Sequence, residues 1–486
     1  MAGQPGYERL SRLDAAFLSF ETANAPMHVA LTLVFQKGPL GRAGGGVDVA
    51  RIRRHVGARL SRVPRYRQKI QKARLTGDFL WVDDQHFDLD YHVRHTSLPQ
   101  PGSDIELKER CAEILERPLN RAHPLWEAWI IEGISDGRFA LLCKVHHCMV
   151  DGVGGMALLQ ALLSVDPVEP SGVIDGWQPR PAPSESELLA SAVKRRQRLI
   201  AGARDTLMAA AADPQKARES FVEGATALLE FARRGLKLPE TVSFNQPIGP
   251  NRRVEWLALD LAQTKSIGTR LAATVNDVAL ATIAGGFRRF LEGRGQLGGA
   301  TSLRTVVPVN LRPPGEEASL GNQASCWMID LPVDQIDPRE TLRRIHAQTV
   351  VHKSQHSARG GELLTSAAEW ANADIMHTVI RALSSAHPYN LIITNVPGPP
   401  TPLYLAGAPM LTAHPHLPLF ESQGIGLAIF RYVDQLHIGL VGDRDQMPDI
   451  GELRYAIDYS FKALVAAAEA AAPAKKQAMA AGSGGH

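Results

Sequence analysis

The sequence predicts an α/β fold of two units joined by a linker. Strand-like runs, apolar and rich in β-branched residues, alternate with segments of helical periodicity in both halves of the chain. A stretch rich in Pro, Ser and Gly at 166–184 separates the two halves. The length of 486 residues is about three times that of a ~150-residue domain, which agrees with two or three structural units.

The composition is that of an ordinary globular protein. Hydrophobic residues make up 44% and charged residues 21%, which excludes wholesale disorder. The net charge of +3 does not indicate nucleic acid as the main partner. No apolar run approaches the ~18 residues of a membrane-spanning helix, and the N-terminus has no signal-peptide core. We therefore expect a cytoplasmic protein that at most lies on a membrane surface.

The cysteines indicate a reducing compartment. They form no CxxC pair, so in a chain of this size they predict reduced and mostly buried thiols rather than a disulfide framework. They are Cys111, Cys143, Cys148 and Cys326.

The first half opens with a buried strand at 27–35 and a helix at 48–62. A hairpin follows, in which strands at 126–133 and 138–147 are joined by the turn sequence Ser-Asp-Gly. Helical spacing returns at 154–165, so the residues between form a strand-to-helix turn. Asp151 lies near the start of that helix, where a carboxylate suits the exposed amides.

Two basic stretches leave their role open. Ten Lys or Arg residues and no acid lie between Arg51 and Arg74, which fits a solvated helix face or an anion site for cofactor phosphates or lipid headgroups. The Ala-rich helical stretch at 185–236 carries a second basic run at 194–204. Such amphipathic helices pack on their own protein or lie on a membrane surface.

The second half repeats the alternation. A strand at 253–261 precedes Thr274 to Asp277, which reads as a capping box opening a helix to about residue 291. Further strands are expected at 302–311, 323–332, 389–396 and 424–432, a helix at 449–470, and a disordered tail at 471–486.

Common cofactor signatures are absent. The chain has no GxxxxGK[ST] loop, no GxGxxG between a strand and a helix, and no HExxH. His146, His147, Cys148 and Asp151 are residue types that bind metals, but adjacent histidines at a strand end point to opposite faces. We therefore predict no metal site.

A paired histidine at a strand end indicates catalysis. Strand alternation places His147 on the same face as an apolar series, and the carboxylate of Asp151 follows four residues later. Glycines at 152, 154 and 155 leave room for a ligand or a close backbone approach.

These residues resemble a known family. The run from His146 to Gly152 fits the HHxxxDG motif of the acyltransferase superfamily that includes chloramphenicol acetyltransferase and peptide-synthetase condensation domains. The rest of the chain resembles the bacterial wax ester synthase/diacylglycerol acyltransferases. The further matching segments are 10–18, 26–29, Pro124-Leu125-Trp126, 276–281, Gly321-Asn322 and 394–399. Departures from the family pattern at Arg12, Cys148 and Thr394 remove no group expected to be catalytic.

The resemblance implies two chloramphenicol-acetyltransferase-like halves with a channel between them. It divides the chain into a half carrying HHxxxDG at 1–175, a linker with amphipathic helices at 176–245, a second half at 246–470 and the tail at 471–486.

The resemblance also assigns roles. His147 is the general base, His146 supports it, and Asp151, with Gly152 beside it, holds the turn, with Arg312 as a candidate partner. Asn276 either contributes to the site, by steadying His147 or by donating to the developing oxyanion, or is only an N-terminal helix residue. The expected substrate-binding residues are Pro124, Leu125, Trp126, Thr394 and Asn395.

The implied function is direct transfer of a long-chain acyl group from acyl-CoA to diacylglycerol or a long-chain alcohol. A thiolate leaves readily, and no GxSxG elbow is present to form an acyl-enzyme. Acyl-CoA is then a co-substrate, and no other cofactor, metal or nucleic acid is expected. Two alternatives stay open: a condensation-type enzyme that esterifies a polyketide or peptide lipid, and a non-catalytic lipid-body coat protein.

Overall fold

The computed structural model describes residues 7–149, 161–168, 176–212, 239–298, 301–310, 324–356 and 389–471, together with Leu159, Gln215 and Arg218. Half of the predicted helix at 154–165 lies outside these residues. So do most of the predicted helical stretch beyond 212 and all but the first residue of the predicted tail.

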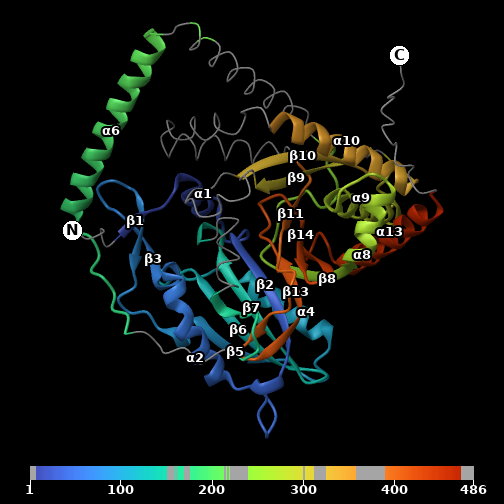
Figure 1. Cartoon of the computed structure of the whole chain (residues 1–486), viewed down its shortest axis with the longest axis horizontal. Helices are drawn as coiled ribbons and strands as arrows, with labels where there is room; N and C mark the ends of the chain where they lie inside the picture. The colour runs from blue at the N-terminus through green and yellow to red at the C-terminus, as the bar shows by residue number, and fades with distance from the viewer. Residues whose placement is uncertain are drawn as a thin grey trace, which may run out of the picture.

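The first of two six-stranded sheets has the strand order β12-β13-β2-β7-β6-β5 (Figure 1). Its strands are β2 (His28–Gln36), β5 (Val93–Ser97), β6 (Trp126–Ile134), β7 (Arg138–His146), β12 (Tyr404–Leu405) and β13 (Ala408–His416). The predicted hairpin is β6 and β7, and its turn includes Asp136 and Gly137 at positive φ. Alternate residues of β7 enter two different hydrophobic cores, so both faces of this strand are buried.

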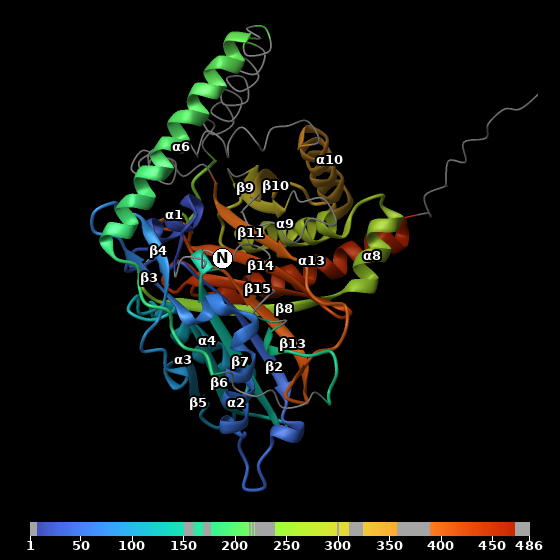
Figure 2. The same ribbon diagram turned by 60° about the vertical axis from the view of Figure 1, so that its left-hand side comes forward.

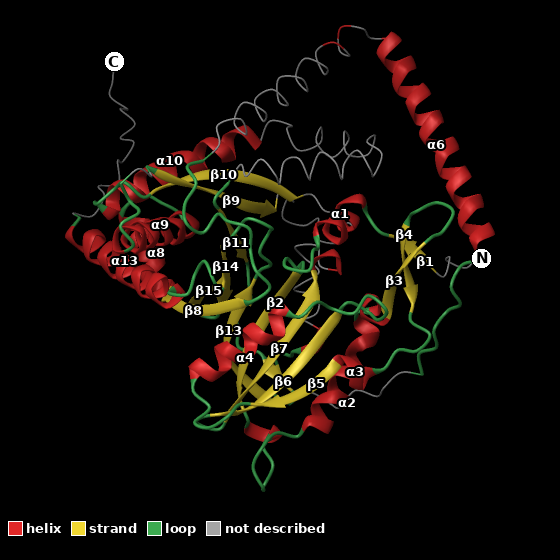
Figure 3. Ribbon diagram, turned by 180° about the vertical axis from the view of Figure 1, so that it is seen from behind, coloured by secondary structure: helices red, strands yellow, loops and turns green. Residues whose placement is uncertain are grey.

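The second sheet has the order β10-β9-β11-β14-β15-β8 (Figure 3). Its strands are β8 (Arg252–Asp260), β9 (Ser302–Asn310), β10 (Ala324–Pro332), β11 (Leu391–Val396), β14 (Ile425–Tyr432) and β15 (Gln435–Asp443). It is contacted by the helices α8 (Leu261–Arg270), α9 (Val275–Gly293), α10 (Pro338–His356) and α13 (Ile450–Ala470). Strands and helices thus alternate as predicted, and the α/β class is confirmed.

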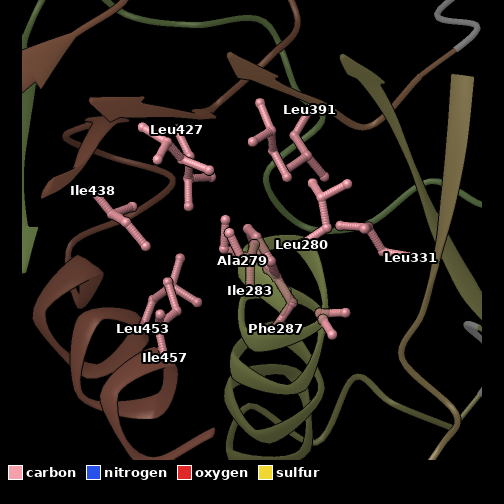
Figure 4. Packing of buried hydrophobic residues seen from close by; sticks show 14 of the residues in the cluster. Ala279, Leu280, Ile283, Phe287, Leu331, Leu391, Leu427, Ile438, Leu453 and Ile457 are labelled. Atoms are coloured by element: carbon pink, nitrogen blue, oxygen red, sulfur yellow. The ribbon is translucent and has the colours of Figure 1, made fainter. Parts of the chain in front are cut away.

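Helix α9 forms the centre of the second core. Its Leu280, Ile283 and Phe287 are fully buried between the sheet and α13 (Figure 4). A Cβ built on Gly286 would lie 2.9 Å from the Cα of Ile457, so α9 and α13 approach each other more closely than a larger residue allows.

A small three-stranded sheet and several helices complete the first half. Its strands are β1 (Tyr7–Arg9), β4 (Phe79–Asp83) and β3 (Gln68–Lys72). The helices are α1 (Arg12–Phe20), α2 (Val49–Arg59), α3 (Leu89–His92) and α4 (Asp104–Glu116), with short 3-10 turns η1 (Gly38–Leu40), η2 (Leu60–Arg62), η3 (Pro64–Arg67) and η4 (His147–Met149). Helix α6 (Glu185–Ala212) begins beside this sheet and runs away from the body (Figures 1 and 2).

Most basic side chains between 51 and 74 have structural uses. Arg51 donates to the carbonyls of Pro39 and Ala406 at 2.8 and 3.2 Å, and Lys69 pairs with Asp84 at 2.9 Å. Arg59 and Arg67 are buried. These contacts show that several basic side chains of this stretch bind other parts of the protein. A bound anion is not needed to explain their placement.

Strand β13 joins the two halves. It comes from the C-terminal part of the chain, yet it pairs antiparallel with β2 of the first sheet, beside which it lies in Figure 1. The carbonyl oxygen of Pro415 would lie 1.7 Å from a Cβ on Gly439 of β15, so β13 crosses close over the second sheet. The second half of the sequence therefore contributes β12 and β13 to the sheet of the first half.

Candidate active site

The turn that carries His147 is fixed by its backbone. Strand β7 ends at His146, whose N–H donates to the carbonyl of Leu125 at 2.9 Å. The next N–H, that of His147, donates to the carbonyl of Met27 at 2.8 Å. The paired histidines are thus held between the residues that lead into β2 and β6.

His147 is partly exposed, and its ring stacks on Phe17 of α1. The ring centroids lie 3.8 Å apart at 17°. Burial by the surrounding protein lowers the pKa of His147 to about 4; a contact with its own backbone opposes this, and nearby His146 adds a smaller lowering effect. The ring is therefore neutral near pH 7, the state in which an imidazole accepts a proton.

His146 lies in different surroundings. Its side chain is 1% exposed and faces the carboxylate of Glu21, with 3.6 Å between Nε2 and Oε1. His28, directly opposite His146 in the β2–β7 register, lies 3.3 Å from the same oxygen. Arg121 holds the other carboxylate oxygen at 2.6 Å. The two adjacent histidines thus have separate roles available to them.

Two predicted residues of the second half meet. Asn395, on β11, donates a hydrogen bond from Nδ2 to Oδ1 of Asn276 at 3.0 Å. Asn276 stands in the first turn of α9, and Thr394 precedes Asn395 on β11 and is partly buried.

The predicted capping box at the start of α9 is confirmed. The Asp277 N–H donates to Thr274 Oγ1 at 3.3 Å, and the Thr274 N–H donates to Asp277 Oδ2 at 2.9 Å. Burial alone would raise the pKa of Asp277, but contacts with His346, Thr274 and Thr349 outweigh it and hold the pKa below its ordinary value. This carboxylate fixes Asn276 in place by anchoring its helix.

Pro124, Leu125 and Trp126 are buried where β6 begins. The indole of Trp126 donates to the carbonyl of Tyr66 at 2.7 Å and stacks on His92 at 4.5 Å. Together with the Leu125 carbonyl that accepts from His146, these contacts give the motif a packing role. Substrate contact by these three residues stays a prediction.

Asp151 and Gly152 lie outside the described residues, as do Arg312, Gly321 and Asn322. In the part of the chain that the structure describes, no group of three or more His, Cys, Asp or Glu side chains is arranged to hold a metal ion. Cys148 is buried beside the histidines, and burial raises the pKa of its thiol well above the usual range.

Comparison with known proteins decides the family. Residues 10–279 match the wax ester synthase/diacylglycerol acyltransferase catalytic domain, and residues 320–465 match the corresponding C-terminal domain. The chain belongs to the wax ester synthase/diacylglycerol acyltransferase family. It is therefore an acyltransferase, as its sequence motifs imply.

Relatives share the whole length. A putative diacylglycerol O-acyltransferase of Mycobacterium tuberculosis is 33% identical over 460 residues, covering 92% of this chain and 88% of that protein. The O-acyltransferase WSD of Acinetobacter baylyi is 30% identical over 459 residues, covering 91% and 94% of the two chains.

Solved structures show the same fold. The wax ester synthase/diacylglycerol acyltransferase from Marinobacter aquaeolei has a TM-score of 0.67 at 24% identity, covering 95% of this chain and all of that one. The first condensation domain of the calcium-dependent antibiotic synthetase has a TM-score of 0.57 at 15% identity, with 97% and 98% covered. The expected two-half architecture of the superfamily is confirmed.

Sequence reasoning missed Phe17, Glu21 and Arg121. Phe17 and His28 fall within the segments that matched the family, but nothing in the sequence pairs them with particular histidines. The β2–β7 register places His28 against His146, and the position of α1 brings Phe17 and Glu21 to them.

Proposed function

We propose that this protein transfers a long-chain acyl group from acyl-CoA to diacylglycerol or a long-chain alcohol, with His147 as general base. The observation that carries the proposal is that His147, the second histidine of the HHxxxDG motif, is partly exposed and neutral, with its ring stacked on Phe17. The printed names of the relatives support the two acceptor classes.

The transfer needs one base and no covalent enzyme intermediate. His147 takes the hydroxyl proton while the acceptor oxygen bonds to the thioester carbonyl carbon. The carbon–sulfur bond then breaks, and the departing CoA thiolate receives the proton from His147. The enzyme returns to its starting state, and an ester and CoA leave.

Asn276 is the proposed second-half contribution. Its Oδ1 is occupied by Asn395, which fixes the amide plane and leaves Nδ2 as the group that can donate to a developing oxyanion. The loss of one such donor costs about 3 kcal/mol of transition-state stabilisation in other acyl-transfer enzymes.

The direct experiment follows thiol release from palmitoyl-CoA with diacylglycerol or hexadecanol as acceptor. We expect acceptor-dependent release by the wild type, its loss in His147→Ala, and normal rates in His86→Ala, whose side chain is exposed and distant in sequence from the site. Lipid binding without acceptor-dependent release would favour the coat-protein alternative. Release only with a carrier-bound hydroxylated peptide or polyketide would favour the condensation-type alternative.

We further propose that the protein works at a lipid surface through α6. Among the described residues no helix is long and apolar enough to cross a membrane. Helix α6 exposes Leu189, Val193, Ile200 and Met208 and carries Lys194, Arg195, Arg196, Arg198 and Arg204. Exposed apolar residues beside basic ones suit an anionic lipid surface.

Flotation with anionic liposomes tests this surface proposal. Reversal of Arg196 and Arg204 to Glu should abolish flotation. Reversal of Arg343 on α10 and Lys462 on α13, which are 70% and 72% exposed, should leave it intact. Equal flotation of both variants would remove the proposal.

A further inference from the structure

Glu21 lies between helix α1 and the histidines His28 and His146. It directly follows α1, the helix whose Phe17 stacks on His147. Its side chain is 11% exposed and enters the space between His28 and His146. One carboxylate oxygen faces both imidazoles, and the other accepts from Nη2 and Nε of Arg121 at 2.6 and 3.1 Å.

The hydrogen bond that the His146 side chain accepts selects one neutral tautomer. The backbone N–H of Cys148 donates to its Nδ1 at 3.1 Å, so Nδ1 carries a lone pair. The proton of the neutral ring is then on Nε2, which faces Glu21 Oε1 at 3.6 Å.

The carboxylate remains charged in this position. Burial alone would raise the pKa of Glu21, but interactions with His146, His28 and Arg121 outweigh it and hold the pKa well below the usual range. A buried charge is tolerated only when it is paired and hydrogen-bonded. Here the groups that face the carboxylate are Arg121, His146 and His28.

We propose that Glu21 is a positioning residue for acyl transfer that acts through His146. Its buried negative charge lies 3.6 Å from Nε2 of His146 and favours a proton on that nitrogen, which leaves Nδ1 free to accept the Cys148 N–H in the turn that carries His147. Glu21 is also the residue at which α1 ends. Its contacts therefore help to hold the helix from which Phe17 stacks on the His147 ring. This inference rests on the proposed function of His147, and Glu21 itself touches no reacting atom.

Glu21→Gln tests the charge at nearly constant shape. The amide cannot offer an acceptor to His146 and to Arg121 at once, so one donor must face another donor. We expect kcat to fall roughly 10- to 100-fold, as for outer partners of ligating histidines. The KM of each substrate should stay within about twofold, because the substrate contacts are unchanged.

A double-mutant cycle with His146→Asn separates this role from general destabilisation. Asn can accept the Cys148 N–H through Oδ1 without a tautomer to fix, so it no longer needs Glu21. In the His146→Asn background Glu21→Gln should change kcat less than about threefold, since coupled residues are not additive.

Matched variants keep the proposal testable. Glu132→Gln removes another Glu–His pair, at 2.7 Å from His95, and should leave kcat unchanged. If Glu21→Gln fails to fold, Arg121→Gln serves instead, because Arg121 is 48% exposed; it should lower kcat in the wild type but not in His146→Asn. Wild-type kcat in the folded Glu21 or Arg121 variant, or an equal loss in both backgrounds, would overturn the inference. Activity retained by His147→Ala would instead overturn the proposed function.

Discussion

Two histidines that are adjacent in sequence meet unlike surroundings. His146 accepts a backbone N–H and faces a buried carboxylate, whereas His147 is partly exposed and stacks on Phe17. The two imidazoles of this turn therefore differ in burial and in the groups that they contact.

The pH dependence of kcat/KM should show the lowered pKa of His147. A base works only when unprotonated, so activity should be constant from pH 8 to about 5 and fall as the pH approaches about 4. Initial rates with palmitoyl-CoA, measured after a stability check at each pH, give this profile. A midpoint near the ordinary value of ~6.5 would contradict it.

Sequence predicted part of this site because local patterns specify it. The end of a strand before glycines and the capping box from Thr274 to Asp277 are local features, and both occur where expected. Glu21 and Arg121 are 100 residues apart, and no periodicity predicts their ion pair. Such contacts follow from strand register and helix placement, which exist only in the folded chain.

Among the elements, α9 shows how close packing limits substitution. Gly286→Ala should destabilise the fold by roughly 1–3 kcal/mol, because the new methyl would overlap Ile457 of α13. Gly293→Ala in the same helix, with nothing within 4 Å of its Cβ, should instead stabilise by about 0.5–1 kcal/mol. Urea unfolding of the two variants compares them, and effects of the same sign would contradict the packing account.

The strands differ in how well the sequence predicts them. The sequence predicts β2, β6, β7 and β14 from their apolar runs. These strands carry such runs because most of their residues on both faces are buried. Strand β13 was not expected, since two prolines and two histidines interrupt its apolar pattern. It forms because its partner, β2, supplies the pairing from another part of the chain.

At the scale of the whole molecule, buried histidines line the joint between the halves. His414 and His416 of β13 lie near His437 of β15, with 5.4 Å between the rings of His414 and His437. The His416 Nε2 pairs with Thr32 Oγ1 of the first sheet at 2.9 Å. Burial lowers the pKa of all three, to about 3 for His416 and about 4 for His437.

Acid should therefore weaken the joint. An unfolded histidine has a pKa of ~6.5, so between that value and about 4 the unfolded chain binds more protons than the folded one. The unfolding free energy should be constant above pH 6.5 and then fall by up to about 1.4 kcal/mol per pH unit for each such histidine. Urea titrations from pH 7 to 5 measure this slope. His416→Gln should make it shallower, and an unchanged slope would contradict the assignment.

The central claim is that His147 is the base and His146 holds the turn. Ester formation from palmitoyl-CoA and either acceptor, measured for His147→Ala and His146→Asn, tests it most directly. We predict a loss of about 10²–10⁴-fold in His147→Ala and of less than about tenfold in His146→Asn. Comparable losses in both variants, or the larger loss in His146→Asn, would contradict it.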